Sequence, residues 1–268
     1  MDWLQAIILG VVQGLTEFLP VSSSGHLAIF KELLGVEASE DLMFEVTVHA
    51  ATVLATIVVF WKPIVQLFAG LFKFRYNDET DYICKLLVGT IPILIVGLFF
   101  KDQVEELFSS LWVVGGSLLI TAVLLYFSDT VARSKVEREN TARGGISFVQ
   151  ALLIGIGQAF AVLPGLSRSG ATISTGLIAG VRREVVAQFS FIMVIIPILG
   201  EMVLALAGGE LAASSTGLLP LALGFLSAFI TGLFACKAMM ALVRRAQLKW
   251  FALYCVTVGF IVILTQIF

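Results

Sequence analysis

Long apolar runs separated by short polar stretches dominate this chain. A helix of about 20 apolar residues crosses the hydrocarbon core of a bilayer, which is roughly 30 Å thick. Six runs fit such a helix, and the pattern therefore predicts transmembrane helices over the ranges 43–61, 82–100, 107–128, 185–208, 211–236 and 250–268.

Two further apolar segments, 3–35 and 146–181, have a different pattern. Each is too short for two ordinary crossings, and each carries proline, glycine and serine near its centre, where they interrupt a helix. This pattern predicts a re-entrant hairpin that enters the membrane and returns to the same side. A non-helical tip is tolerated at that depth only where protein or a water-filled cavity satisfies its backbone.

The two odd segments align without gaps at a spacing of 145 residues. "AIILGVVQGLTEFLPVSSSGH" at 6–26 lies over "ALLIGIGQAFAVLPGLSRSGA" at 151–171, and nine of 39 positions between 6 and 44 are identical to their counterparts. Two apolar segments always share some letters. The shared polar positions, such as Gln13 with Gln158, favour a duplication over chance similarity.

The repeat predicts the fold class, an all-α membrane protein with an inverted-topology repeat, six transmembrane helices and two re-entrant helical hairpins. Because three spans follow each hairpin, the second half would enter from the opposite face, and the two tips would meet near the middle. We expect one transmembrane domain over 1–268. Repeat 1 covers about 1–130 with its hairpin at 3–35, and repeat 2 covers about 146–268 with its hairpin at 146–181. Ser23 and Arg168 occupy equivalent positions and should lie close together.

Composition agrees with a membrane protein and excludes the usual soluble classes. Of the 268 residues, 59% are hydrophobic and 13% are charged, against about 25% charged in soluble domains. No cleavable signal peptide is evident, since the N-terminus lacks a basic region. The three cysteines are scattered through apolar segments and indicate neither a disulfide framework nor a metal cluster. No nucleic-acid partner is expected.

The basic residues are sorted between alternate connecting segments. Of 17 lysines and arginines, 14 lie within 62–85, 129–145, 182–183 and 237–249, whereas the other connections hold only Lys31 and Lys101. By the positive-inside rule, this predicts a multi-pass membrane protein with six spans and both termini on the outer face.

The tip of the second hairpin carries Arg168, the single charge in residues 144–181. An arginine at this depth is costly and marks a functional site by default, although it can also be a structural arginine tied to carbonyls. Hydroxyls and backbone N–H groups surround it at the start of a helix, a combination that suits phosphate oxygens. The candidate phosphate-binding residues here are Ser167, Ser169, Gly170 and Thr172.

The tip of the first hairpin supplies complementary groups. Gln13 and Glu17 are four residues apart and share a helix face, and Ser22 and His26 do so if a helix starts at the serines. A hydroxyl, an imidazole and a carboxylate facing an anion site form a constellation for phosphoryl transfer or hydrolysis. Packing of the histidine and helix capping by the serines are the structural alternatives.

Two acidic positions outside the tips are weaker candidates. Glu45 and His49 are four residues apart at the start of the first span, where they either orient the site or pair locally. Glu201 lies inside the fourth span with no motif around it. A structural role is expected for Glu201.

"QGLTEFLPVSSSGH" and "PGLSRSGAT" resemble the two signature motifs of the bacterial undecaprenyl-diphosphate phosphatase family, the bacitracin-resistance type. The first resembles [E/Q]xxxE followed by PVSSxGH, and the second resembles PGxSRSxxT. The resemblance covers nearly the whole chain. It implies a protein of the bacterial plasma (inner) membrane whose active site opens to the outer (periplasmic or extracellular) face. It implies removal of the terminal phosphate of undecaprenyl diphosphate, which recycles a lipid carrier for peptidoglycan and other cell-wall polymers. The family's functional positions fall on Gln13, Glu17, Ser23, His26, Ser167, Arg168 and Thr172.

The resemblance leads to a mechanistic hypothesis. Arg168 and Thr172, with Ser22, Ser24, Gly25 and the other tip serines, would bind phosphate oxygens. Ser23 would be the nucleophile and His26 the general base or acid, although direct attack by water with Ser23 only binding is an open variant. Glu17, with Gln13 or Glu45, would hold Mg²⁺ or Ca²⁺, or would orient the imidazole.

Two rival functions remain open from the sequence. Inverted repeats with broken helices are typical of transporters, so a lipid-phosphate flippase is the main alternative. An intramembrane serine hydrolase is the second, but the arginine within SRS favours phosphate over a peptide carbonyl. The expected partners are a polyprenyl diphosphate substrate, membrane lipid and a second copy in a homodimer.

Overall fold

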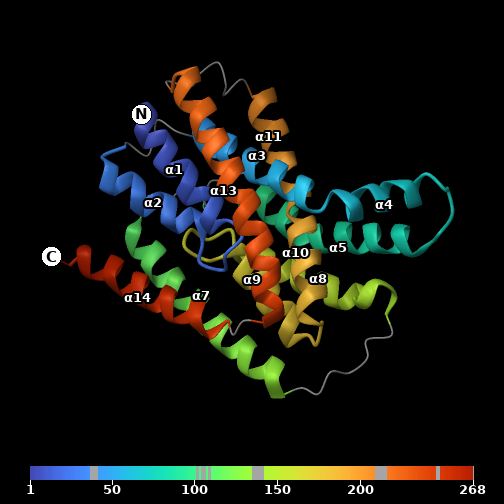
Figure 1. The fold of residues 1–268 in the computed structure, drawn as a ribbon. Helices are drawn as coiled ribbons and strands as arrows, with labels where there is room; N and C mark the ends of the chain where they lie inside the picture. Colours follow the sequence, from blue (N-terminus) through green and yellow to red (C-terminus); the bar gives the residue numbers. More distant parts are fainter. Residues whose placement is uncertain are drawn as a thin grey trace.

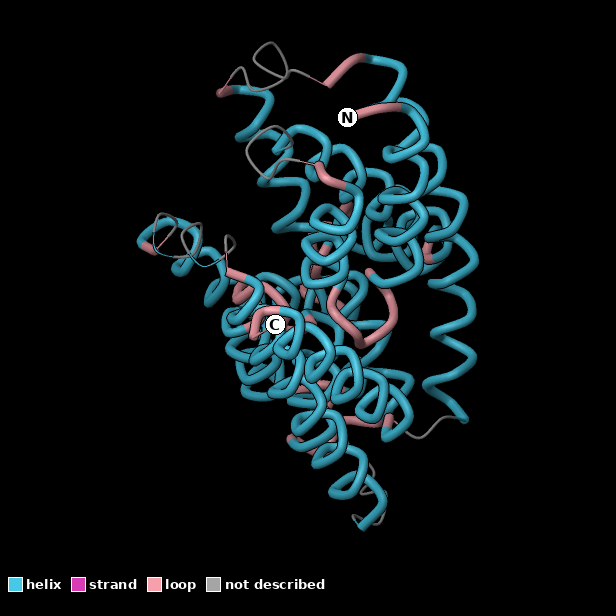
Figure 2. The backbone as a smooth tube through the Cα atoms, turned by 90° about the vertical axis from the view of Figure 1, so that its left-hand side faces the viewer, coloured by secondary structure: helices cyan, strands magenta, loops and turns pink. Residues whose placement is uncertain are grey.

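The computed structural model describes residues 1–36, 42–100, 103, 107, 110–134, 142–208, 216–245 and 248–267. These residues form helices joined by turns, with no strand among them (Figure 2). The helices in chain order (Figure 1) are α1 (Trp3–Thr16), α2 (Ser23–Leu34), α3 (Leu42–Val59), α4 (Trp61–Leu71), α5 (Asp78–Phe99), α7 (Leu111–Ser134), the short η2 (Arg143–Gly145), α8 (Phe148–Phe160), α9 (Arg168–Ile178), α10 (Arg183–Met193), α11 (Ile195–Ala207), α13 (Leu218–Arg245) and α14 (Lys249–Thr265).

Several helices are long and apolar enough to cross a membrane. In the described part of the chain they are Asp78–Phe99, Leu111–Ala132, Arg183–Ala207 and Leu218–Val243, and α3 with α4 makes a fifth if the bent pair is one span. The last predicted span corresponds to α14, a shorter apolar helix of 17 residues. The prediction of an all-α, multi-pass membrane protein is thereby confirmed. Residues 211–215, the predicted start of the fifth span, lie outside the described residues, as does Lys101.

The segment 62–85, predicted as a connection, is largely helical. After α3 the chain turns by 78° at Phe60 and continues as α4. Pro63 is the third residue of α4, where a missing N–H costs nothing. The following helix begins at Asp78 instead of residue 82, because Asn77 caps it and acidic residues occupy its first turn. Such residues favour a helix N-terminus.

Residues 3–35 and 146–181 both form helical hairpins, the first hairpin (α1–α2) and the second hairpin (α8–α9). Each begins with a capping box, made by Asp2 with Gln5 and by Ser147 with Gln150. In each, the glutamine then donates from Nε2 to a carbonyl near the end of the hairpin. The distances are 3.1 Å to Leu34 and 3.0 Å for the equivalent bond in the second hairpin.

The tips of the two hairpins touch one another (Figure 1). Ser169 Oγ donates to the carbonyl of Leu19 over 3.2 Å. A Cβ added to Gly25 would lie 3.0 Å from Cα of Gly165, which itself has a φ of +88°. Glycine is needed on both sides because the backbones approach so closely. The tips therefore form one contact between the two halves of the chain.

Each hairpin also packs against a long helix from the other half. On α1, a Cβ at Gly10 would lie 2.4 Å from the carbonyl oxygen of Gly224 in α13. On α8, a Cβ at Gly155 would lie 2.2 Å from the carbonyl oxygen of Gly89 in α5. Small residues permit this close helix packing. The halves are therefore interlocked, with each holding the hairpin of the other.

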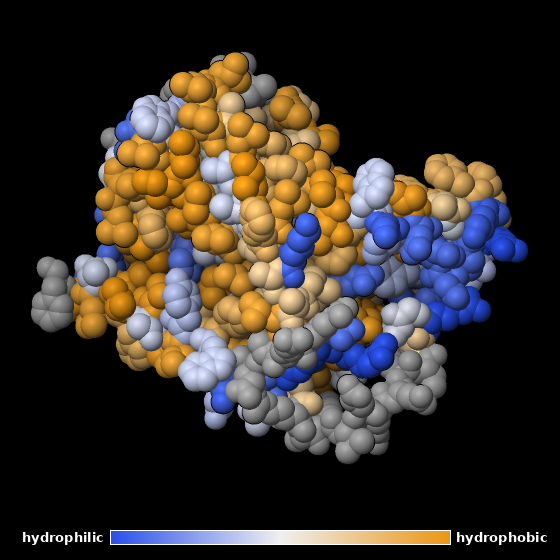
Figure 3. Space-filling model, in the orientation of Figure 1, coloured by the Kyte–Doolittle hydropathy of each residue, from blue (hydrophilic) through white to orange (hydrophobic). Residues whose placement is uncertain are grey.

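The surface of the molecule is mostly apolar. Figure 3 shows hydrophobic residues covering α13 and the helices beside it, and hydrophilic residues gathered over the loop that joins α4 and α5. Exposed apolar side chains are expected where lipid is the solvent. The polar tips of the hairpins, in contrast, lie largely inside the molecule.

Candidate active site

The first hairpin contributes a carboxylate at the end of α1. Glu17 follows the last residue of that helix, and its side chain is 9% exposed. Gln13, one turn earlier, donates from Nε2 to Glu17 Oε2 over 2.9 Å. Ser23, the first residue of α2, donates its hydroxyl to the same oxygen over 2.6 Å. The tip loop thus folds so that the Ser23 hydroxyl contacts the Glu17 carboxylate.

The second hairpin contributes the guanidinium. Arg168 is the first residue of α9, and its Nη2 lies 3.4 Å from Glu17 Oε1. Its side chain is 24% exposed. Ser23 and Arg168, which occupy equivalent repeat positions, therefore contact the two oxygens of one carboxylate. The lone charge of residues 144–181 is balanced by the lone carboxylate of the opposite tip.

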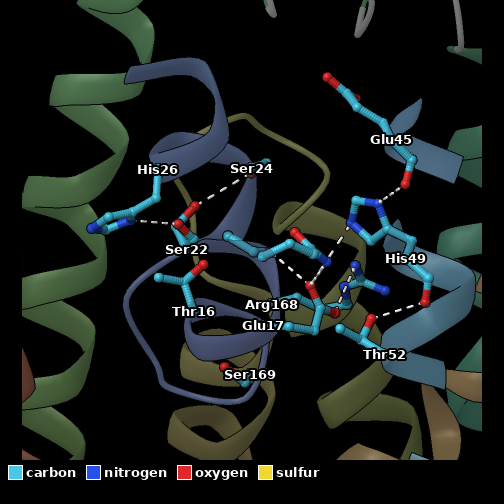
Figure 4. Close-up of polar contacts among 12 residues, drawn as sticks. Thr16, Glu17, Ser22, Ser24, His26, Glu45, His49, Thr52, Arg168 and Ser169 are labelled. Atoms are coloured by element: carbon cyan, nitrogen blue, oxygen red, sulfur yellow. Dashed lines mark hydrogen bonds and ion pairs between the residues drawn. The ribbon is translucent and has the colours of Figure 1, made fainter. Parts of the chain in front are cut away.

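A third group comes from α3. His49 Nε2 lies 3.8 Å from Glu17 Oε2, and Nδ1 lies 2.8 Å from the carbonyl oxygen of Glu45 (Figure 4). A carbonyl only accepts, so Nδ1 carries a hydrogen and Nε2 is the nitrogen that faces Glu17. The Glu45 carboxylate instead pairs with Lys31 over 2.6 Å. In the sequence, the four-residue spacing of Glu45 and His49 was the only signal for this imidazole.

His26, expected as the general base or acid for Ser23, lies apart from the Glu17–Arg168 pair. Its side chain points away from Glu17 and Arg168 (Figure 4). Nδ1 is 2.7 Å from the carbonyl oxygen of Ser22, and Nε2 is 2.7 Å from the hydroxyl of Tyr254 in α14. The four-residue spacing that put His26 on the face of Ser22 also turns the ring back onto the start of its own helix.

The remaining tip serines hold the helix starts. Ser22 and Ser167 each accept from a backbone N–H three residues further on, over 3.2 and 3.1 Å. The hydroxyls of Ser24 and Ser169 lie 3.3 Å from these capping oxygens. The capping role that the sequence left as an alternative is thus present. It sets two helix N-termini, which favour anions, at the same place.

Thr172 lies one turn into α9 and is fully buried. Its hydroxyl is 2.8 Å from the carbonyl oxygen of Arg168 and 2.6 Å from the hydroxyl of Ser190 in α10. In this geometry Thr172 links α9 to α10 below the arginine. Its contacts support the backbone that carries the guanidinium.

A pocket opens beside the Glu17–Arg168 pair, between the hairpins, α3 and the α10–α11 pair. Its polar lining comes from both hairpins and from hydroxyls on the spans: Glu17, Arg168, Ser169, Thr52, Thr56 and Ser190. Its apolar lining consists of Phe18, Val53, Phe191, Val194 and Ile198. The pocket thus brings polar and apolar side chains together beside the ion pair.

The residues present offer few ligands to a divalent cation. In the described ranges no three His, Cys, Asp or Glu side chains group as metal ligands. Gln13 Oε1, however, is buried without a hydrogen-bond partner there, and the amide nitrogen of the same side chain bonds Glu17. Mg²⁺ commonly takes one or two carboxylates and completes its shell with substrate phosphates and water. Glu45, paired with Lys31, does not join them.

The arrangement is suited to phosphoryl transfer. A hydroxyl at 2.6 Å from a carboxylate has an acceptor for its proton, and an adjacent guanidinium can stabilise charge on phosphate oxygens. Phosphoryl transfer depends mainly on such positioning and charge stabilisation. A hydroxyl, a carboxylate that can accept its proton and a guanidinium that can bind an anion are therefore in contact with one another.

Comparison with known proteins gives concordant matches. A family model described as bacitracin resistance protein BacA matches residues 6–261. A protein named undecaprenyl-diphosphatase from Bacteroides thetaiotaomicron is 50% identical to this chain over 100% of both sequences. Another of that name from Parabacteroides distasonis is 51% identical over 98% of both sequences. One from Methanosphaera stadtmanae is 38% identical over 100% of this chain and 99% of its own. With its paired tip motifs and matches along its whole length, this chain belongs to the bacitracin resistance protein BacA family.

Proposed function

We propose that this protein is a phosphatase that converts undecaprenyl diphosphate to undecaprenyl phosphate and inorganic phosphate. The names of its relatives support this substrate. The observation that carries the proposal is that Glu17 binds a serine hydroxyl with one oxygen and an arginine with the other, at the contact of two buried tips. The pocket beside this pair offers apolar side chains to the first prenyl units.

In the proposed reaction the terminal phosphorus is attacked by Ser23 Oγ while Glu17 accepts the hydroxyl proton. The bond from that phosphorus to the bridging oxygen breaks, and undecaprenyl phosphate leaves as a stable anion. Water then hydrolyses the phosphoserine, and Glu17 returns its proton to the serine. Arg168 and the N-termini of α2 and α9 stabilise the negative charge. His49 replaces His26 as the imidazole next to the reacting groups.

A divalent cation, Mg²⁺ or Ca²⁺, is part of this proposal, held by Glu17 and Gln13. When bound, the ion neutralises charge on the diphosphate. The unpartnered oxygen of Gln13 supports this placement. Glu17→Gln tests it, because residual activity with an unchanged dependence on added Mg²⁺ would contradict the assignment.

For the membrane arrangement, we propose six spans formed by α3 with α4, α5, α7, α10 with α11, α13 and α14. The two hairpins are re-entrant, and the halves about 1–130 and about 146–268 form an inverted repeat in a single domain of 1–268. The repeated contacts of the two hairpins and the meeting of their tips support this plan. Labelling of single introduced cysteines in loops tests it, since both connections of one hairpin must be reached from the same side.

The proposed location is the bacterial plasma (inner) membrane, with both termini and the site opening to the outer face. The sorting of basic residues supports this orientation. There the enzyme recycles the lipid carrier for peptidoglycan and other wall polymers, and by doing so confers resistance to bacitracin. A homodimer stays a prediction, which the mass of the detergent-solubilised protein tests.

The decisive experiment measures phosphate release from undecaprenyl diphosphate by the purified full chain in detergent. Arg168→Ala should lower the rate at least about a hundred-fold, as loss of a preorganised donor to a transition-state anion does. Arg182→Ala, an exposed arginine at the start of α10, is the matched control. Release without a membrane also separates a phosphatase from a flippase. A folded Arg168→Ala protein with near-normal turnover would refute the proposed site.

A further inference from the structure

His26, which is buried, and Tyr254, which is 44% exposed, form a pair beside the reacting groups but not among them. His26 is 4% exposed, and its ring stacks on that of Tyr254 with centroids 5.6 Å apart and planes 10° from parallel. Tyr254 comes from α14, near the C-terminus, whereas His26 belongs to the first hairpin. The pair therefore joins the last helix to the first tip.

The hydrogen bonds of His26 leave neither nitrogen for Ser23. The carbonyl oxygen of Ser22 can only accept, so Nδ1 donates to it. In the neutral ring, Nε2 then accepts from the hydroxyl of Tyr254. The imidazole is thus held between a backbone carbonyl and a phenol, and its tautomer is set by that carbonyl.

The residue that His26 holds has an unusual backbone. Ser22 has φ +72° and ψ +100°, a sparsely populated conformation for a residue with a side chain. It directly precedes Ser23, whose hydroxyl bonds Glu17. A shift at Ser22 would therefore move the proposed nucleophile. Such strain persists where surrounding contacts maintain it.

The second hairpin provides an internal comparison. There the equivalent capping residue, Ser167, has an ordinary φ of −67°. The residue equivalent to His26 is Ala171, which has no group to bond a carbonyl. The imidazole is present at the tip where the serine before the helix is strained, and absent at the tip where it is not.

A second contact from α14 reaches the same loop. The thiol of Cys255, next to Tyr254, lies 3.7 Å from the carbonyl oxygen of Pro20. The last helix thus contacts the first tip at Pro20 directly and at Ser22 through His26. These two points lie on the short loop that leads into Ser23.

We infer that Tyr254 and His26 are positioning residues: Tyr254 orients His26, and His26 fixes the Ser22 carbonyl so that Ser23 meets Glu17 and the substrate. This inference rests on the proposed phosphatase function. It assigns a role to α14 and gives His26 a role other than proton transfer.

Variants that keep one nitrogen at a time test the inference. An asparagine amide places an N–H near the position of Nδ1, whereas a glutamine amide places it near Nε2. His26→Asn should stay within about ten-fold of wild-type kcat, and His26→Gln and His26→Ala should lose about a hundred-fold or more. Tyr254→Phe keeps the stacked ring and should lower kcat about ten-fold with KM nearly unchanged. Tyr126→Phe, an exposed tyrosine on α7, is the matched control.

Hydrogen exchange supplies a readout that does not need activity. Tyr254→Phe should raise deuterium uptake in residues 19–27, and Tyr126→Phe should not. Equal losses in His26→Asn and His26→Ala, or unchanged uptake in Tyr254→Phe, would overturn the inference. If the wild type released no phosphate, the proposed function would fail, while the exchange measurement would still decide whether Tyr254 holds the tip.

Discussion

The first and second hairpins repeat their backbone contacts but differ in their reactive groups. Both start with a capping box and both use a glutamine to close the hairpin at matching positions. At their tips, however, Glu17 is matched by Val162 and Ser23 by Arg168. One tip therefore carries the carboxylate and the hydroxyl, and the other carries the guanidinium. The two hairpins are thus alike in their backbone contacts and complementary in the charged groups at their tips.

The largest expected effect comes from removing the Ser23 hydroxyl, which the second tip lacks at the equivalent position. If Ser23 is the nucleophile, Ser23→Ala should lower kcat by at least about a thousand-fold, as removal of a covalent nucleophile does. If Ser23 only binds and water attacks directly, the loss should be nearer ten-fold. Single-turnover phosphate release, with a search for labelled phosphoserine in the wild type, measures this difference. A small loss with no phosphoserine would remove the covalent step.

A smaller effect should test what the two hairpins share. Gly155→Ala places a methyl group 2.2 Å from the carbonyl oxygen of Gly89, so the second hairpin should be pushed from α5. Overpacking of this kind costs about 1–3 kcal/mol, and a lower thermal unfolding midpoint in detergent should report it.

The first hairpin provides the mirror variant for this test. Gly10→Ala should behave alike, because its added methyl meets the carbonyl oxygen of Gly224. Gly116→Ala is the control, since nothing lies within 4 Å of an added Cβ there. A drop for one hairpin alone would show that the shared packing is not equally important in the two halves.

The smallest expected effect concerns Gln13 and Gln158, which occupy equivalent positions in the two hairpins. Gln13 bonds Glu17, whereas both amide atoms of Gln158 are buried without a partner in the described part of the chain. Replacing an unsatisfied amide by an apolar group of similar shape is nearly neutral or stabilising. Gln158→Leu should therefore leave the unfolding midpoint unchanged or slightly higher, and Gln13→Leu should lower phosphate release. Destabilisation by Gln158→Leu would indicate that this amide has a partner after all.

The sequence predicted features that depend on local spacing or on the repeat. The shortness of two apolar segments with proline, glycine and serine near their centres predicted both hairpins, and the isolation of Arg168 in one of them made it a candidate site residue. Gln13 and Glu17 are one turn apart in the same helix, so their contact follows from helix geometry. These features need little knowledge of how distant helices pack.

The features that the sequence did not predict depend on distant packing. Only the placement of α3 brings His49 to Glu17, and only the placement of α14 gives His26 its partner Tyr254. A four-residue spacing indicates which side chains share a face but not what that face meets. For the same reason the sequence pattern predicted a connection at the stretch that forms α4. In the structure its apolar residues form a helix after the bend at Phe60.

The exchange of hairpins between halves has a consequence for biogenesis. α1 leaves the ribosome long before α13, the helix whose glycines receive it. Until then the first tip lacks its contacts from the second half, among them those of Arg168 and Tyr254. Assembly of the site therefore requires the C-terminal half of the chain. A nascent protein that ends at its midpoint lacks both α13 and the Arg168 partner of Glu17.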